Sequence, residues 1–441
     1  MEPENLTEIV TRIIFQLAVI LLAAKVAGEV CIRYLRVPPV LGELAAGVAI
    51  GPFALGALQI GGVGPLFPVP HGALGDPFQA IPREIYVIGQ MASVVLLFTA
   101  GLETDLKQFL RFAGPATLVA LGGLILPFSF GVAATVVMGF ATGFMDPVAL
   151  FMGAIMTATS VGITARVLAD LGRLNTPEGT TIIAAAVLDD VVGILVLSMV
   201  VALATTGVVS ASALGLIAVR AIGFWLGLTA VILLTSGWIF RTLMGFRVPG
   251  ATLALTLALA LAAAALAEQA GLAMIIGAYS VGLALSSTPL RQRIEESLMG
   301  VYHALVPVFF VVMGMLVDLG AMQGTLLFGL VLTLLAIVGK IVGSGGFALL
   351  GGFNRRGAWR IGLGMLPRGE VALIIAGIGL ARGVIGVQEF GVAIMMTLVT
   401  TVLAPVLLVP AFRGDRPGTR RDQGSGAGEQ QARSGEHPGG G

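Results

Sequence analysis

The sequence predicts an all-α polytopic membrane protein with about thirteen transmembrane helices, inverted repeats and two broken crossover helices. Composition is the first indication, because 57% of the residues are hydrophobic and only 11% are charged, whereas soluble domains carry about 25% charged residues. Recurring apolar windows of roughly 20 residues are the second, since each can cross a bilayer as a helix. Two apolar segments interrupted by glycine, proline or hydroxyl residues are the third.

The spans follow from the apolar windows in chain order. Basic residues cluster in alternate connections between the spans. The other connections are nearly without basic residues, with Arg83 and Arg382 as the exceptions. By the positive-inside rule the basic set is cytoplasmic, and an odd number of spans then places the N-terminus outside and the C-terminus in the cytoplasm. We expect spans near residues 9–30, 38–58, 84–103, 114–140, 147–171, 178–206, 211–240, 250–267, 271–287, 301–318, 324–351, 357–382 and 389–411.

Composition also excludes several classes of protein. A net charge of +1 gives no electrostatic basis for a nucleic-acid partner, and the single cysteine, Cys31, excludes an intrachain disulfide and a cysteine-rich metal site. The acidic start, MEPENLTE, argues against a cleaved signal peptide. Residues 412–441, rich in Gly, Arg and Gln, predict a disordered cytoplasmic tail. The sequence holds no P-loop motif, and we expect neither an enzyme nor a cofactor.

Two neighbouring acids, Asp189 and Asp190, lie at the centre of the apolar run IIAAAVLDDVVGILVLSMV, residues 182–200. An ionisable side chain at mid-membrane costs roughly 2.5–3.5 kcal/mol, so each acid is a functional candidate. Successive residues on a helix point about 100° apart, so the two carboxylates cannot both face one partner. We therefore expect one acid to pair with a basic residue of a neighbouring helix and the other to face a cavity and bind a cation.

Lys340, in LLAIVGKIVGSGG, is the expected partner of one of these acids, because a lone buried lysine loses its proton or finds an anion. Arg368 and Glu370, in MLPRGEVALI, are expected to satisfy each other as a local pair. Arg220 is expected to be structural, since it can reach the membrane interface or pair. Glu43 lies near the cytoplasmic end of its span, where partial solvation or packing accounts for it.

Two spans carry signs of interruption. The stretch MTATSVGITARV, residues 156–167, places hydroxyl side chains at mid-membrane, and MLPRGEVALIIAGIGLARG, residues 365–383, contains Pro367 and several glycines. Such segments in corresponding halves of a transporter mark discontinuous helices, whose free carbonyls and dipole ends can ligate a cation. One segment precedes the helix with the two aspartates and the other follows the helix with Lys340, which predicts an inverted repeat. The alternative is that each hydroxyl bonds back to its own helix.

The available ligand atoms indicate a chemical class. Carboxylate, hydroxyl and carbonyl oxygens suit hard cations, and the sequence offers no Cys/His cluster for a transition metal. A carboxylate can hold a proton or a cation but not both, and that exclusion alone exchanges one for the other. Without a nucleotide-driven motor, uphill transport must use an ion gradient. The sequence therefore predicts a secondary transporter that exchanges protons for a cation.

Four motifs in this order, TATSVGIT, AAVLDDVVG, GKIVGSG and LPRGEVALI, resemble the second of the monovalent cation/proton antiporter families. VPPVLGELAAGVAIGP and GAYSVGLALS resemble helices of the same family, and the likeness covers about residues 9–411. The double aspartate with the intramembrane lysine is similar to the family's electrogenic bacterial sodium/proton branch. The resemblance implies a multi-pass protein of the bacterial inner (plasma) membrane.

The resemblance also implies how the chain is organised. Residues 1–411 would form the transmembrane antiporter domain of a homodimer, with core helices near 84–206 and 324–411. The core would shift against dimerisation helices near 9–58 and 211–318 in elevator-type alternating access. Potassium-exporting relatives commonly carry a glutamine in place of the first acid and a nucleotide-sensing domain, so the resemblance favours sodium or lithium over potassium.

The resemblance further implies roles within the site. Asp190 would be the main proton and sodium site, and Asp189 would be the partner of Lys340. Lys340 would release its own proton when sodium arrives, giving two protons per sodium. Arg368 and Glu370 would form a conformational ion pair in the second crossover helix. The polar lining of the first crossover helix would come from Thr157, Thr159 and Ser160.

Four alternatives differ from this prediction in ways that can be tested. A potassium/proton antiporter differs only in the cation. A sodium-coupled symporter of an organic anion has a similar broken-helix fold and would need polar side chains for a larger solute. An intramembrane aspartyl protease needs two acids on different helices that share a proton, which adjacent acids on one helix cannot do. A channel needs a continuous pore, for which buried acids paired with a lysine are poorly suited.

Overall fold

The computed structural model of the chain describes residues 6–35, 37–60, 64–68, 80–206, 211–318, 320, 325–413 and 418–420. Within these residues the architecture is helical apart from one antiparallel pair of two-residue strands, β1 (Gln59–Ile60) and β2 (Gly64–Pro65), which confirms the predicted all-α class. The helices are α1 (Leu6–Val30), α2 (Pro39–Ile50), α3 (Arg83–Glu103), α4 (Leu106–Val137), α5 (Pro147–Thr157), α6 (Val161–Asp170), α7 (Pro177–Thr206), α8 (Ala211–Gly245), α9 (Ala251–Gln269), α10 (Met274–Leu285), α11 (Arg291–Met315), α12 (Leu326–Leu350), α13 (Arg355–Gly364), α14 (Glu370–Ala381) and α15 (Val387–Ala411).

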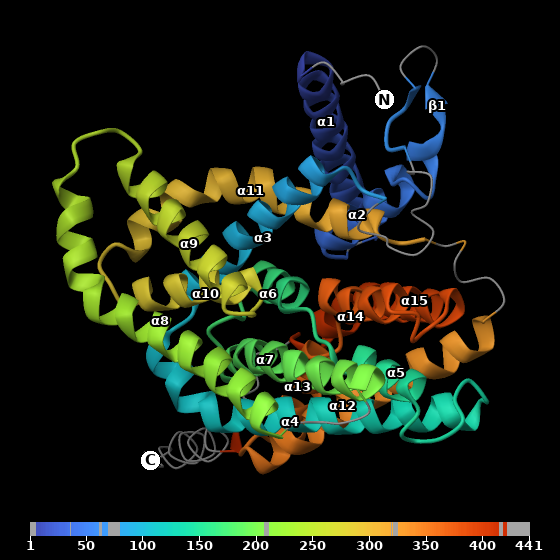
Figure 1. Cartoon of the computed structure of the whole chain (residues 1–441). Helices are drawn as coiled ribbons and strands as arrows, with labels where there is room; N and C mark the ends of the chain where they lie inside the picture. Colours follow the sequence, from blue (N-terminus) through green and yellow to red (C-terminus); the bar gives the residue numbers. More distant parts are fainter. Residues whose placement is uncertain are drawn as a thin grey trace, which may run out of the picture.

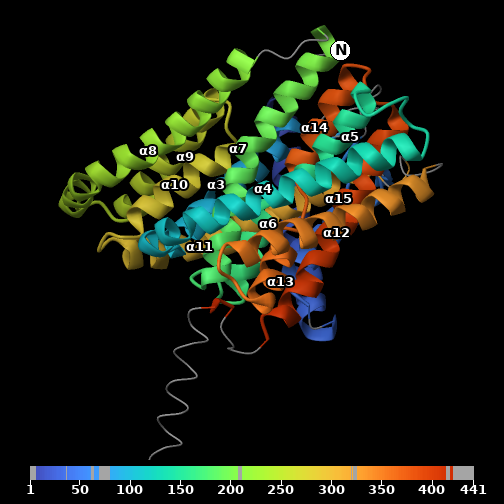
Figure 2. The same ribbon diagram turned by 90° about the horizontal axis from the view of Figure 1, so that it is seen from below.

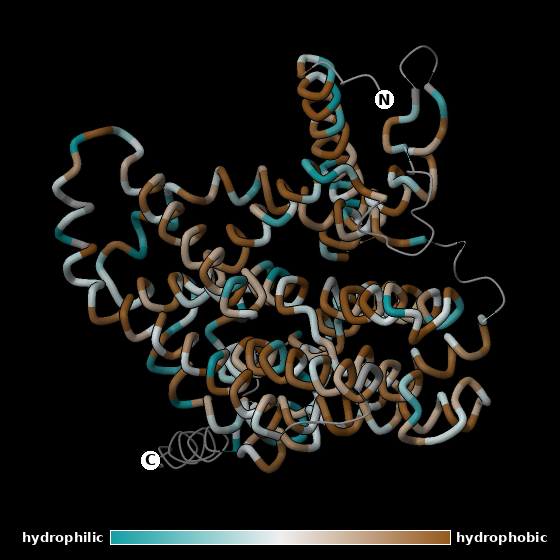
Figure 3. The backbone as a smooth tube through the Cα atoms, in the orientation of Figure 1, coloured by the Kyte–Doolittle hydropathy of each residue, from teal (hydrophilic) through white to brown (hydrophobic). Residues whose placement is uncertain are grey.

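Eleven segments in the described part of the chain are long and apolar enough to cross a membrane. Hydrophobic residues run along most of the length of these helices (Figure 3). The other two predicted spans fall on shorter helices. Residues 271–287 contain the apolar helix α10, and residues 357–382 contain most of α13 and the apolar helix α14. The multi-pass membrane class is therefore confirmed, while the number of thirteen crossings stays a prediction.

The helices pack in two groups (Figures 1 and 2). One group contains α4–α7 and α12–α15, in which α4 packs along α12 and also contacts α5 and α7. The other contains α1–α3 and α9–α11, in which α3 packs on α10 and α11. Helix α8 contacts α7 as well as α9 and α10, so it joins the groups. The prediction placed the helix near residues 84–103 in the core, whereas the packing of α3 groups it with α10 and α11.

The first group repeats one order of elements. A long helix, a broken helix and a second long helix follow one another as α4, α5 and α6, α7, and again as α12, α13 and α14, α15. The two long helices α4 and α12 approach closely because glycines meet at their contact. A Cβ at Gly122 would collide with the backbone carbonyl of Gly343, and a Cβ at Gly343 with that of Gly122. Small residues at such crossings let helix backbones approach in lipid.

The end of the described chain returns to the first group of helices. The backbone N–H of Asn354 donates to the carbonyl of Gly418 at 2.9 Å, and the N–H of Arg420 donates to the carbonyl of Gly352 at 3.1 Å. Phe353 and Thr419 form an isolated antiparallel bridge. Residues 418–420 are thus fixed against the turn between α12 and α13, although they belong to the segment predicted as a disordered tail. The other residues of that tail beyond 413 lie outside the described residues.

Candidate functional site

The two broken helices meet at their interruptions. The first break is the extended stretch between Thr157, where α5 ends, and Val161, where α6 begins. The second lies between Gly364, where α13 ends, and Glu370, where α14 begins. The helical hydrogen bonds stop at each break, so backbone carbonyl and N–H groups there can bond to other partners. The predicted interruptions near 156–167 and 365–383 are therefore present in the structure.

Direct hydrogen bonds join the two breaks. The backbone N–H of Ser160 donates to the carbonyl of Pro367 at 2.7 Å, and Thr164 Oγ1 donates to the carbonyl of Gly364 at 2.8 Å. A Cβ at Gly369 would come within 2.7 Å of Ser160 Oγ, so glycine is required for this close approach. Ser160 Oγ also accepts from the N–H of Ile163 at 3.4 Å and caps α6.

Asp189 is bound from two neighbouring elements. Lys340 Nζ of α12 donates to Asp189 Oδ2 of α7 at 2.9 Å, and the two side chains are 0% and 1% exposed. Thr159 Oγ1, in the first break, donates to the same oxygen at 2.6 Å. The second oxygen, Oδ1, is buried and has no hydrogen-bond partner among the described residues. This arrangement satisfies the lysine charge, because a buried ion pair needs good geometry and further hydrogen bonds to offset desolvation.

Asp190 faces a different space from its neighbour. Its residue is only 4% exposed, and it lines a cavity of about 10 Å³ together with Thr159 and Ser160 of the first break. That volume is close to the minimum for one water molecule, roughly 10–15 Å³. Phe309 of α11 forms the opposite wall, so the cavity lies where the two groups of helices meet. A desolvated cation or a proton fits this space, and a larger solute does not.

A wider cavity lies next to the small one around Asp190. It has a volume of about 230 Å³ and is lined by Tyr86 and Gln90 near the start of α3 and by Glu268 near the end of α9. Ile275 and Val371 line both this cavity and the small one around Asp190. The two spaces are therefore neighbours, separated by these two side chains.

Arg368 supports the first break from the second. Its side chain is fully buried, and Nη2 donates to the carbonyl of Met156 at 2.6 Å in the last turn of α5. A cation at this position complements the negative end of the helix dipole. Thr401 Oγ1 of α15 donates in turn to the Arg368 carbonyl. The side chain of Glu370 lies outside the described part of the chain, so the predicted pair of Arg368 with Glu370 stays a prediction.

The remaining predicted residues separate into lining and structural positions. Thr157 Oγ1 donates to the carbonyl of Ala154 at 2.8 Å, which is the back-bonding alternative for this residue. Glu43 is only 2% exposed on α2, and Arg220 is exposed on α8. No prediction from the sequence covered Gly123, where a Cβ would lie within 2.3 Å of Ser344 Oγ on α12, so a glycine allows this close approach of α4 and α12. A stripe of small residues on α4 was the available signal.

A second buried ion pair was not predicted from the sequence. Arg360 Nη1 of α13 donates to Glu178 Oε1 of α7 at 2.6 Å, and both side chains are at most 5% exposed. The Arg360 guanidinium also lies 5.0 Å from the ring centroid of Phe412. The signal was present, because Arg360 falls inside the predicted span 357–382. This pair joins α13 to the start of α7, the helix that carries both aspartates, and it lies outside the site itself.

Comparison with known proteins places these residues in a family. The family described as "Sodium/hydrogen exchanger, transmembrane" matches residues 18–414. The high-affinity Na(+)/H(+) antiporter NhaS3 of Synechocystis sp. is 36% identical over 433 residues, covering 94% of this chain and 92% of that protein. The Na(+)/H(+)-K(+) antiporter GerN of Bacillus cereus is 34% identical over 404 residues, covering 90% of this chain and 96% of that protein.

A solved structure shares the fold. The sodium proton antiporter MjNhaP1 of Methanocaldococcus jannaschii superposes with a TM-score of 0.66 at 17% identity, covering 92% of this chain and 98% of that one. The predicted family resemblance and the transmembrane helical fold are both confirmed by these matches. The chain belongs to the transmembrane sodium/hydrogen exchanger family.

Proposed function

We propose that this protein exchanges sodium, or lithium, for protons across the bacterial plasma membrane, with Asp190 as the shared binding site. The main support for this proposal is that the two neighbouring acids have different surroundings. Asp189 is bound by Lys340, whereas Asp190 lines a small cavity at the crossing, the place where the two broken helices meet at their interruptions. The relatives NhaS3 and GerN are named as sodium/proton antiporters. A transporter rather than an enzyme is the class that these findings support.

Competition at one carboxylate supplies the coupling. A cavity of about 10 Å³ holds a proton on Asp190 or a bare cation beside it, and the two exclude each other. Hydroxyl oxygens of Thr159 and Ser160 line the same cavity, and such oxygens are ligands that hard cations prefer. Sodium therefore enters only when the proton has left, and the reverse step returns the proton.

Lys340 links the site to charge movement. The direct contact of Lys340 is with Asp189, and Asp190 is the next residue of the same helix. A sodium ion that arrives at the aspartates repels the ammonium and favours release of its proton. Release of one proton from Asp190 and one from Lys340 for each sodium would make the exchange electrogenic.

Alternating access would follow from movement between the two helix groups. The group of α4–α7 and α12–α15 carries both aspartates, Lys340 and the crossing, and it forms the core in this proposal. The group of α1–α3 and α9–α11 supplies the opposite wall at Phe309 and would form the fixed dimerisation part of a homodimer. An elevator-like shift of the core then exposes Asp190 alternately to the two sides, with the N-terminus outside and the C-terminus in the cytoplasm.

Two alternatives receive different support. Potassium is the stronger one, because GerN is named as an antiporter that also involves potassium. A symporter of an organic anion is weaker, because the cavity around Asp190 has no room for such a solute.

Proton flux in proteoliposomes tests the proposal. Addition of Na⁺ or Li⁺ is expected to drive proton movement that Asp190→Asn abolishes, whereas Glu295→Gln, a change at a surface carboxylate of α11, leaves it unchanged. Exchange retained in Asp190→Asn would remove this residue from its role. Proton movement driven by K⁺ but not by Na⁺ would establish the potassium alternative instead.

A further inference from the structure

A pocket outside the transport site opens at the end of the molecule where α4 begins and the chain returns. Its volume is about 650 Å³, within the range of roughly 300–1,000 Å³ that small-molecule sites occupy. Phe112 and Pro115 of α4, Pro177 of α7 and Phe353 after α12 form its apolar walls. Thr419 and Arg420 of the returning segment close one side. None of these residues contributes to the crossing or to the ion pair of Asp189.

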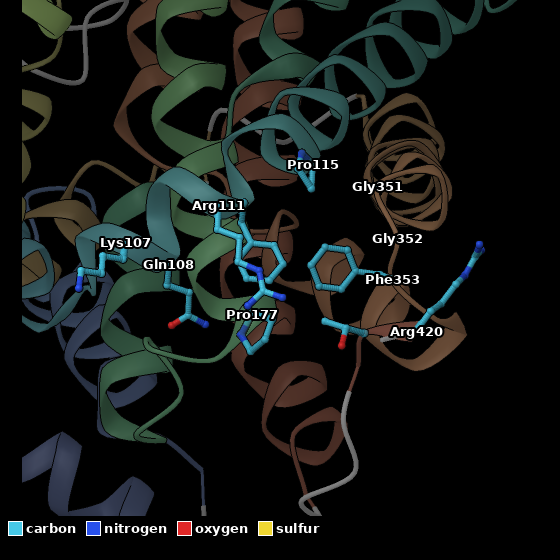
Figure 4. Close-up of a pocket in the computed structure, with 11 residues that line it drawn as sticks. Lys107, Gln108, Arg111, Pro115, Pro177, Gly351, Gly352, Phe353 and Arg420 are labelled. Atoms are coloured by element: carbon cyan, nitrogen blue, oxygen red, sulfur yellow. The ribbon is translucent and has the colours of Figure 1, made fainter. Parts of the chain in front are cut away.

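The charged side chains of this pocket are all cationic. They are Lys107, Arg111 and Arg420. Figure 4 shows Arg111 above Pro177 at the centre, with Lys107 and Arg420 on opposite sides. The Arg111 guanidinium lies 5.6 Å from the ring centroid of Phe112, which helps to hold it at this position.

No carboxylate of the described chain neutralises these cations within ion-pair distance. Two acids of the described residues lie close in sequence to the pocket walls, and both have other partners. Asp105 accepts hydrogen bonds from the backbone N–H groups of Lys107 and Gln108. Glu178 forms the buried ion pair with Arg360. Three cations around one concave space therefore leave an excess of positive charge there, which favours an anionic ligand.

We propose that this pocket binds a phosphate-bearing ligand between α4 and the returning segment 418–420. Phosphate oxygens are recognised by arginine and lysine through charge-assisted hydrogen bonds, and the walls of Phe112, Phe353 and Pro115 accommodate an apolar part next to the phosphate. Two sources share this chemistry, the head group of an anionic phospholipid and a soluble phosphate compound. Because Arg420 is held by the bond of its N–H to Gly352, a bound phosphate would also fasten the returning segment to the core.

Binding measurements with two kinds of probe test this site. In the first arm, pyrophosphate and ADP are titrated into the full-length protein in phosphatidylcholine nanodiscs and followed by calorimetry. In the second arm, native mass spectrometry of the detergent-solubilised protein compares cardiolipin and phosphatidylglycerol with phosphatidylcholine. Binding confined to the second arm identifies the lipid source, and binding confined to the first identifies a soluble compound. Either result supports the site only with the variant outcome below.

A matched pair of double variants locates the binding. Lys107→Gln/Arg111→Gln removes two charges that line the pocket, and Arg355→Gln/Arg356→Gln removes two exposed charges of the neighbouring helix α13 that do not. The first variant is expected to weaken binding by about tenfold or more, since it removes two of the three cations that would attract the phosphate. The second is expected to leave binding nearly unchanged. No binding in either arm, or equal effects of the two variants, would overturn the proposal.

Discussion

Lys340 and Asp189 form a buried ion pair across two long helices, with Nζ and Oδ2 separated by 2.9 Å. Thr159 adds a hydrogen bond to the same oxygen, so one atom of α7 receives donors from α12 and from the first break. A movement of the first break would therefore change the surroundings of the ion pair between Lys340 and Asp189.

Replacement of the lysine tests this coupling. Lys340→Gln leaves Asp189 buried without its cation, and loss of one partner of a buried pair typically destabilises a protein by about 3–5 kcal/mol. We expect a lower thermal unfolding temperature and a weaker dependence of exchange on membrane voltage. The double variant Asp189→Asn/Lys340→Gln is expected to recover part of the stability. Unchanged voltage sensitivity in Lys340→Gln would count against the lysine as a proton carrier.

The threonines of the first break are expected to differ in effect. Thr159→Val removes the hydrogen bond to the Asp189 carboxylate and a hydroxyl from the cavity of Asp190. A hydrogen bond to a charged group contributes about 1.5–3 kcal/mol, so we expect a raised apparent KM for sodium of about tenfold or more. Thr157→Val is the control, because its hydroxyl bonds to Ala154 in its own helix. Equal sodium kinetics in the two variants would show that the Thr159 contact does not affect the site.

The close approach of the breaks depends on one glycine. Gly369→Ala places a Cβ 2.7 Å from Ser160 Oγ and 2.9 Å from Ser160 Cβ, so the crossing must shift and exchange should fall strongly. Gly377→Ala lies on the same helix α14 and meets no atom within 4 Å. It is expected to preserve exchange and to stabilise the protein by about 0.4–1 kcal/mol. Transport assays and melting curves on both variants distinguish a local clash from a general effect on α14.

We expect the stability of the fold to depend on pH through Asp146, which caps the start of α5. Asp146 Oδ1 accepts from the N–H of Val148 at 3.0 Å, and Oδ2 accepts from the N–H of Thr142 at 2.9 Å. These bonds, that of Thr142 first, hold the pKa of Asp146 below its ordinary value. The carboxylate therefore stabilises the fold at pH above its ordinary pKa, and this contribution is lost as pH falls through the lowered pKa.

This direction of the pH dependence predicts how substitutions of Asp146 change stability. Asp146→Ala should lower stability at neutral pH by about 1 kcal/mol, as loss of a helix cap does. The difference from the unmodified protein should shrink in acid, whereas Asp146→Asn, which keeps a capping oxygen, should lose less at neutral pH. Melting curves across the acid range measure both effects. A difference that stays constant at all pH values would show that the charge of Asp146 contributes nothing.

Much of the fold could be read from local patterns. Long apolar windows predicted the membrane class, since a bilayer requires about twenty apolar residues per helix. Pro367 and the hydroxyl run at 157–160 predicted the two interruptions, because such residues weaken a helix at any position in a fold. The packing of α3 on α10 and α11 could not be read from local patterns, since these partners lie far along the sequence.

The sequence alone determined that two acids stand next to each other in a buried helix and must point in different directions, because helical geometry depends only on spacing. Tertiary structure decided which of them meets Lys340. The residues left both acids as candidates, and the family resemblance implied Asp189. The packing of α7 against α12 brings Asp189 to Lys340, and no local pattern of either helix specifies that packing. The bond of Arg368 to Met156 and the basic pocket beside residues 418–420 likewise join distant segments, so only the packed chain could reveal them.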